Sequence, residues 1–168
     1  MKGLKYIALG IGAFFGGRYL LSLNRAKNKV LTIVTGQKES ITAQGITIRV
    51  KYNIKNPTRA NMKMTAPLLK LSFGGKLLAS STMKKVDIPL DARDESGRIV
   101  IKAFNETGEI STTILVPWLS VLGVSQQLLS RLQSQDPNEK IKLEIETTSR
   151  IYTLAGSYPF DEITTITI

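Results

Sequence analysis

The sequence of 168 residues contains neither cysteine nor histidine. Without cysteine the chain has no disulfide, no thiolate metal site and no cysteine nucleophile. Without histidine it has no imidazole base, no Ser-His-Asp triad and no two-histidine metal site. No phosphate-binding glycine loop and no G-x-S-x-G motif is present either. We therefore expect a protein that is not an enzyme and has no catalytic residue, metal ligand or cofactor.

Acidic residues are missing from two long stretches of this basic chain, whose formal net charge is +10. Residues 1–30 contain six basic residues and no acid, and residues 40–86 contain nine basic residues and no acid. Residues 87–168 contain twelve acids against seven bases. Such an asymmetry suggests a charged partner on one side of the molecule.

Charge is also missing from residues 6–17, and after Arg18 the apolar character continues to Leu23. A helix over residues 6–23 would be about 27 Å long, close to the ~30 Å of a bilayer's hydrocarbon core. We predict a transmembrane helix within residues 1–29, which makes the chain a single-pass membrane protein. A cleaved signal peptide and a helix buried in a protein assembly are the two alternatives.

Three groups of residues belong to this predicted segment. The anchor residues are the large apolar and aromatic side chains Tyr6, Ile7, Leu9, Ile11, Phe14, Phe15, Tyr19, Leu20 and Leu21. Gly12 and Gly16 form a G-x-x-x-G pattern that lets helices pack closely in lipid. The predicted contacts to lipid head groups are the flanking or interrupting cations Arg18, Arg25, Lys27 and Lys29.

From residue 30 the hydropathy alternates with a period of two, which is typical of half-buried antiparallel strands. Alternate side chains of a strand point to opposite faces. In residues 46–54 the apolar side chains and Tyr52 should therefore face the core, while Arg49 and Lys51 face outward. We predict that Arg49, Lys51 and Lys55 form a basic face that contacts head groups or phosphates. An ordinary solvated sheet face is the alternative.

The rest of the chain predicts many short strands and one helix. The further strands are expected at residues 30–34, 68–73, 76–79, 83–89, 97–104, 111–116, 140–147, 149–155 and 162–168. Gly74-Gly75 predicts a two-residue hairpin, and residues 91–97 and 136–138 predict turns. An amphipathic helix should begin at Pro117 and end near Gln133, with its leucines in the core. We expect a mainly β antiparallel sandwich as one domain over residues 30–168.

The order of these features resembles the LEA type 2 family, that is, the LEA14-like or WHy domain. The resemblance is carried by the alternating strand that ends in Asn56-Pro57-Thr58, by the hairpin LLKLSFGGKLLASS and by Gly156–Phe160, which reads GSYPF. It implies a fibronectin-III-like sandwich with a helix, and a non-enzymatic protein that is often associated with membranes. It supplies no catalytic residue, and the basic run 40–86 is not one of its hallmarks.

We therefore predict a membrane-anchored structural or interaction module of LEA14-like type. Its expected partners are a lipid membrane and other proteins, or copies of itself in a larger assembly. The first alternative is a structural protein in the shell or membrane layer of a virion or another large assembly. The second is a nucleic-acid-binding module that uses the surface of residues 40–86, with nucleic acid the less favoured partner.

Overall fold

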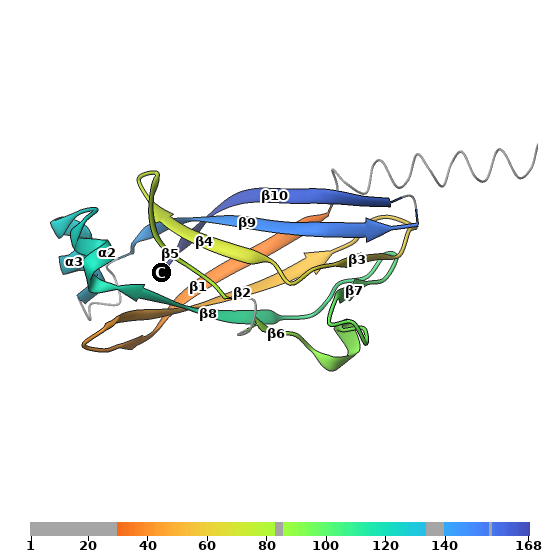
Figure 1. The fold of residues 1–168 in the computed structure, drawn as a ribbon, viewed down its shortest axis with the longest axis horizontal. Coiled ribbons are helices and arrows are strands. Elements are labelled where there is room, and N and C mark those ends of the chain that lie inside the picture. Colours follow the sequence, from red (N-terminus) through yellow and green to blue (C-terminus); the bar gives the residue numbers. More distant parts are fainter. Residues whose placement is uncertain (1–29, 83–85, 134–139, 155) are drawn as a thin grey trace, which may run out of the picture.

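The protein is mainly β and forms a sandwich of two antiparallel sheets (Figure 1). The structure is a computed structural model and describes residues 30–82, 86–133, 140–154 and 156–168. The first sheet has the strand order β1-β2-β8-β6, with β1 Leu31–Ile41, β2 Gly45–Lys55, β8 Ile110–Pro117 and β6 Val86–Asp87. The second contains β3 Met62–Met64, β4 Leu68–Phe73, β5 Lys76–Ser80, β7 Ile99–Ile101, β9 Lys142–Thr153 and β10 Gly156–Thr167.

Strand β2 confirms the predicted alternation and supplies one wall of the core. Its inward side chains are all buried, and they are Ile46, Ile48, Val50, Tyr52 and Ile54. Because β2 lies between β1 and β8, these residues face the apolar side chains of the second sheet, such as Leu71 and Ile145. Burying each such side chain contributes roughly 1.5–3 kcal/mol to folding, which makes this strand the centre of the sandwich.

Strand β9 organises the second sheet and corrects a sequence-based prediction. Residues 140–147 and 149–155 were expected to be two strands, but Lys142–Thr153 is a single strand that pairs with β10 along its whole length. Thr147, Thr148 and Ser149 at its centre continue the strand, as β-branched threonine does readily. On its other edge β9 pairs with β4 and then with β3. Between them, Thr65 bridges to Arg150 through backbone and side-chain hydrogen bonds.

The predicted hairpin is confirmed. Gly74 and Gly75 join β4 to β5, and both have positive φ angles of 55° and 76°, as a type I′ turn requires. Strand β10 begins at Gly156, earlier than the expected residue 162, and it includes Pro159. Proline fits because, among the described strands, β10 pairs with β9 alone, so its other edge needs no ladder donor.

The predicted single helix is two short helices, α2 Trp118–Leu122 and α3 Gln126–Gln133. Gly123 ends α2, and the Ser125 hydroxyl accepts a hydrogen bond from the Leu128 N–H as a cap of α3. Glycine disfavours the helix interior and serine favours the N-cap, so the break follows from the sequence. Pro117 is the last residue of β8 and the N-cap of α2, so it lies one position before the helix.

Several other strand limits differ from the prediction. Strand β1 runs on to Ile41 instead of ending at residue 34, and β3 was not predicted because three residues are too few for a period-two pattern. Strand β7 covers only Ile99–Ile101 of the expected residues 97–104. Of the strand expected at residues 83–89, residues 83–85 lie outside the described residues, and β6 is Val86–Asp87. The expected turn at residues 136–138 lies outside the described residues.

The strand registers bring several loops together at one end of the sandwich. Leu31 pairs with Lys55, so β1 begins where β2 ends. Met62 pairs with Ile101 and Lys63 with Tyr152, so β3 begins where β7 and β9 end. We call this end, with residues 56–61, residues 102–109 and Leu154, the entry end, because Val30 enters β1 there (Figure 1). Helices α2 and α3 lie at the opposite, helical end.

Candidate functional site

The predicted basic face lies on the outer side of β2, and each of its three cations has an acidic partner. Arg49 donates a hydrogen bond to Glu39 of the neighbouring strand β1. The Lys51 Nζ lies 3.0 Å from a Glu109 carboxylate oxygen, and the Lys55 Nζ lies 3.2 Å from a Glu106 oxygen. These pairs reduce the positive charge that the face offers to a phosphate, so its basic character is weaker than the sequence suggested.

Two other lysines of the basic residues 40–86 also have acidic partners. Lys63 pairs with Asp94 at 2.7 Å, and Lys70 pairs with Glu146 at 3.2 Å. Together with the three pairs on β2, five of the seven bases of residues 40–86 that the structure describes are in ion pairs. Four of their acidic partners come from residues 87–168, because strands from the two halves of the chain lie side by side. The bases of residues 40–86 and the acids of residues 87–168 are separate in the sequence, but in the folded protein they lie side by side.

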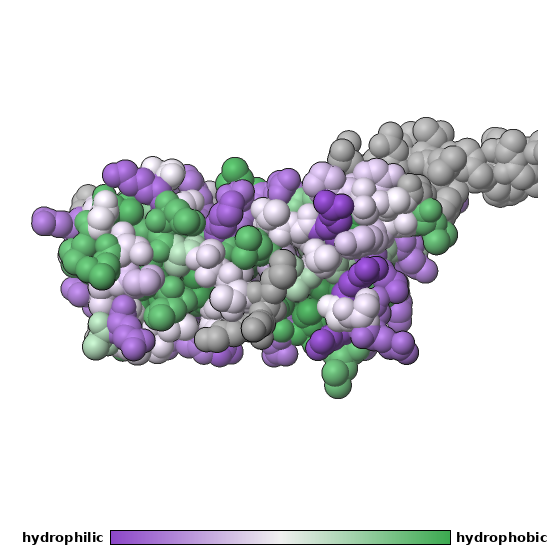
Figure 2. Space-filling view, viewed as in Figure 1, coloured by the Kyte–Doolittle hydropathy of each residue, from purple (hydrophilic) through white to green (hydrophobic). Residues whose placement is uncertain are grey.

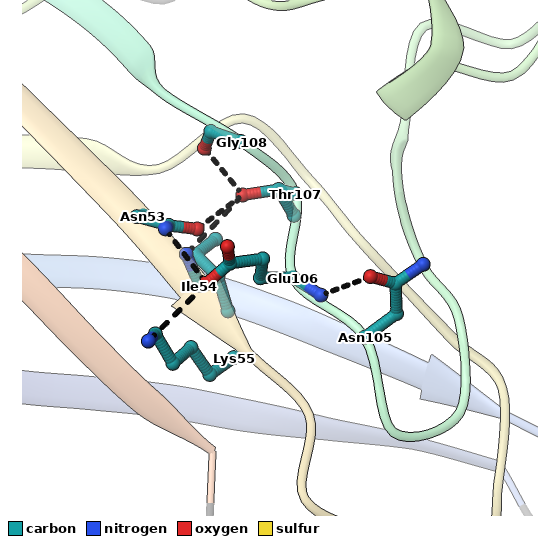
Figure 3. Close-up of polar contacts among 7 residues, drawn as sticks. All are labelled: Asn53, Ile54, Lys55, Asn105, Glu106, Thr107 and Gly108. Atoms are coloured by element: carbon teal, nitrogen blue, oxygen red, sulfur yellow. Dashed lines mark hydrogen bonds and ion pairs between the residues drawn. The ribbon is translucent and has the colours of Figure 1, made fainter.

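Glu106 links the end of β2 to the loop that leads into β8 (Figure 3). Its carboxylate accepts a hydrogen bond from the Asn53 amide at 3.1 Å and pairs with Lys55. Hydrogen bonding to Lys55, then to Asn53, and the lysine charge lower the pKa of the Glu106 carboxyl. The next residue, Thr107, is buried and its hydroxyl accepts a hydrogen bond from the Ile54 N–H at 3.2 Å. The Asn56 N–H in turn donates to the Asn105 carbonyl at 2.9 Å, so this loop is fixed on both sides of Lys55.

The Asn56 side chain connects two loops at the entry end. Its side chain is buried, and its amide donates hydrogen bonds to the carbonyl oxygens of Ala60 at 2.8 Å and Lys102 at 3.0 Å. Its side-chain oxygen accepts hydrogen bonds from the Thr58 N–H and the Thr58 hydroxyl. Because Ala60 and Lys102 belong to different loops, one buried amide holds both loops against the end of β2.

Phe104 is presented at the tip of one of these loops. It has a φ of 53°, the only positive φ of a non-glycine residue in the described part of the chain. Its N–H donates to the Thr58 carbonyl, yet its side chain is 67% exposed. A solvent-open hollow of about 480 Å³ lies beside it, lined by Lys55, Asn56, Pro57, Phe104, Asn105 and Glu106. The backbone is thus held in an unfavourable conformation that turns an aromatic ring outward.

In the acidic turn at residues 91–97, the Asp94 carboxylate already has hydrogen-bond partners within the protein. The Asp94 carboxylate accepts hydrogen bonds from the Ser96 N–H, the Ser96 hydroxyl and the Arg98 N–H, and it pairs with Lys63. Hydrogen bonding to Lys63, then to Ser96 and Arg98, lowers the pKa of Asp94. Within the residues that the structure describes, no group of three or more Asp and Glu residues is placed to hold a metal ion.

Large apolar side chains are exposed at the helical end. The predicted core position Leu122 is 49% exposed, which corrects its assignment, whereas Val121, Leu128 and Leu132 are buried as expected. Leu119 on α2 is 83% exposed, and Leu77 on β5 is exposed as well. Figure 2 shows apolar side chains gathering over this end of the molecule. The break after Leu122 explains the difference, because α3 does not continue the helical face of α2.

The predicted anchor residues 6–23, the glycines Gly12 and Gly16 among them, lie outside the described residues. So do the four predicted head-group cations of residues 18–29. Of the described helices α2 and α3, neither has the length and apolar character that crossing a membrane requires.

Sequence reasoning missed Phe104 and understated Asn56. Asn56-Pro57 was interpreted as the end of a strand and as part of the family resemblance, although asparagine is also a signal for a side-chain-stabilised turn. Phe104 lies between Ala103 and Asn105, and no short pattern in the sequence shows whether its ring is buried or exposed. Its exposure depends on hydrogen bonds between residues that are distant in the sequence.

Comparison with known proteins shows the fold alone. No protein-family model and no curated protein matches the sequence. A crystal structure of a protein from Archaeoglobus fulgidus is similar over 83% of this chain and 96% of that one, with a TM-score of 0.50 and 9% identity. A solution structure of a protein from Arabidopsis thaliana covers 83% of this chain and 80% of its own, with a TM-score of 0.50 and 11% identity. The chain therefore has an architecture that folded domains from an archaeon and a plant share.

Proposed function

We propose that the protein is a membrane-anchored structural or interaction module in which residues 6–23 span the bilayer and residues 30–168 form a LEA14-like, fibronectin-III-like domain. The cations Arg18, which interrupts the span near its end, and Arg25, Lys27 and Lys29, which follow it, hold the head-group boundary. Such cations contribute about 1 kcal/mol each near anionic lipid. The domain acts by contact with lipid and protein partners and carries out no chemical reaction.

The observation that carries this proposal is the position of Val30. It is buried where β1 begins, only seven residues after Leu23, the last residue of the apolar segment. A chain of seven residues spans at most about 25 Å, so the segment and the entry end of the sandwich are closely tethered.

Flotation of the full chain with lipid vesicles tests the proposal. We expect the chain to float with neutral phosphatidylcholine vesicles and to remain bound in 1 M salt, because hydrophobic insertion does not depend on charge. Ile11→Lys should weaken flotation, since a lysine near the centre of a span costs about 3 kcal/mol. Asn24→Lys adds the same charge outside the segment and should float like the original chain. A full chain that stays with the soluble fraction would refute the anchor.

The second candidate is a structural protein of a virion or another large assembly. The exposed leucines Leu77, Leu119 and Leu122 at the helical end favour it, because exposed apolar residues that lie together mark contact surfaces. This candidate predicts oligomers of the full chain in mild detergent, and a monomer at all concentrations would count against it. Nucleic-acid binding has less support, since the cations of the basic face are paired with acids.

A further inference from the structure

The entry end presents apolar side chains that the sandwich does not need for its core. Phe104 is 67% exposed, and Leu154, which follows β9, is 88% exposed. The registers of β3 with β7 and with β9 place both residues at the entry end, where Leu31 pairs with Lys55 and β1 begins. Two elements that are distant in the sequence therefore each place a large apolar side chain in solvent at this end.

The backbone around Phe104 is held rigidly in its exposed position. The positive φ of Phe104 costs free energy in a residue with a side chain, and such conformations persist where neighbouring contacts impose them. Here the Asn56 side chain binds the Lys102 carbonyl, and the Asn56 N–H donates to the Asn105 carbonyl. The loop is anchored on both sides of Phe104, which points to a use for the ring outside the fold.

Two cations accompany these apolar residues. Arg59 and Lys102 are both exposed, and neither takes part in the five ion pairs of the described residues. Each lies on a loop that Asn56 fixes. Aromatic residues together with unpaired basic residues are the combination that favours the boundary between head groups and acyl chains. An anionic lipid surface attracts the positive charges of Arg59 and Lys102 and offers an apolar layer to the side chains of Phe104 and Leu154.

We infer that the entry end rests on the membrane surface, with Phe104 and Leu154 inserted among the head groups and with Arg59 and Lys102 facing lipid phosphates. This inference depends on the proposed anchor, because residues 24–29 allow Val30 to lie at most about 25 Å from the end of the apolar segment. Strand β9 has twelve residues and is therefore about 40 Å long, so the helical end points away from the bilayer.

Tryptophan reporters at the two ends of the full chain test this orientation. The chain has one tryptophan, Trp118 at the helical end, whose indole N–H donates to the Thr42 carbonyl. Phe104→Trp adds a reporter at the entry end, and Leu119→Trp adds a matched exposed reporter at the helical end. Each chain is reconstituted into floated vesicles of phosphatidylcholine and phosphatidylglycerol, with and without lipid brominated near the head group.

We expect bromine to remove most of the emission that Phe104→Trp adds and to leave the emission of Trp118 and of Leu119→Trp unchanged. If Phe104→Trp does not fold, Leu154→Trp serves as the entry-end reporter, with the same expected loss. A chain that floats but shows no quenching at the entry end, or shows quenching at Leu119→Trp, overturns this inference and leaves the anchor intact. A chain that does not float overturns the proposed anchor and this orientation together.

Discussion

At the residue scale, the Asn56 side chain holds the loop that carries the exposed Phe104. Its buried amide binds carbonyls of two loops, and its side-chain oxygen accepts two hydrogen bonds from Thr58. An unsatisfied buried polar group costs about 1–3 kcal/mol, so this residue stabilises the fold through the groups that it satisfies. A side chain of similar size without the amide would leave these loops without a common attachment.

Asn56→Ala should lower the free energy of unfolding by about 3 kcal/mol, since it removes several buried hydrogen bonds at once. The measurement is urea-induced unfolding followed by circular dichroism. Asn105→Ala is the matched control, because Asn105 is an exposed asparagine in the same region whose side chain accepts one hydrogen bond, from the Glu106 N–H, and it should lower stability by at most about 1 kcal/mol. Equal effects of the two substitutions would contradict the role assigned to Asn56.

The paired carboxylates predict how stability depends on pH. The pKa values of Glu106 and Asp94 are lowered in the folded protein, by Lys55 and Lys63 respectively as the main partners. A lowered folded-state pKa means that these groups stabilise the fold above their unfolded pKa of about 4, and that this contribution is lost as the pH falls further.

We therefore expect the urea midpoint to stay nearly constant from pH 7 to pH 5 and to fall between about pH 4 and pH 2, where the carboxylates take up protons. Glu106→Gln should reduce this acid-dependent loss, because the variant has no carboxylate to protonate beside Lys55. Glu95→Gln, which changes an exposed glutamate in the turn after Asp94, should leave the loss as it is. A midpoint that is independent of pH over the acid range would refute the stabilising role of these pairs.

At the scale of elements, the strongest periodic patterns were predicted well and the boundaries less well. The alternation of β2 and the Gly74-Gly75 hairpin are local signals, and both are confirmed. The merging of two expected strands into β9 depends on β10, β4 and β3 pairing along it, which no short window of sequence contains. The break between α2 and α3 was readable from Gly123 and Ser125, but the apolar periodicity concealed it.

The pairing of β2 with β8 depends on a close approach at Gly45. A Cβ atom added there would overlap the Val116 carbonyl oxygen and lie 2.9 Å from the Val116 carbonyl carbon. Because these are backbone atoms of the neighbouring strand, the strands would have to move apart. Gly45→Ala should therefore lower the free energy of unfolding by about 2 kcal/mol, as overpacking typically does.

Thermal or urea unfolding of Gly45→Ala measures this effect. Gln44→Ala changes the preceding exposed residue and should stay within about 0.5 kcal/mol of the original chain. Hydrogen exchange should show the loss of protection at the helical end of β2 and β8 first. An unchanged stability of Gly45→Ala would mean that the close approach of the two strands is not required.

At the scale of the whole molecule, the fold redistributes the charge that the sequence separates. The strand pairing and the loops at the strand ends bring acids of the second half beside bases of the first half, so the described strands form no large basic face. The sequence could predict β2 and its cations, but it could not predict their acidic partners, which lie at least 31 residues away in four of the five pairs. Both ends of the sandwich instead present exposed large apolar side chains, Phe104 and Leu154 at the entry end and Leu77, Leu119 and Leu122 at the helical end.

The central claim is that residues 6–23 lie within the bilayer, and one measurement tests it most directly. Because the chain contains no cysteine, Ala13→Cys in the apolar segment and Ala43→Cys in the exposed turn between β1 and β2 each carry a single nitroxide label in the full chain reconstituted into vesicles. We predict that the label at residue 13 collides frequently with oxygen and rarely with a water-soluble nickel complex, and that the label at residue 43 shows the reverse. Equal access of the nickel complex to both labels would contradict the claim.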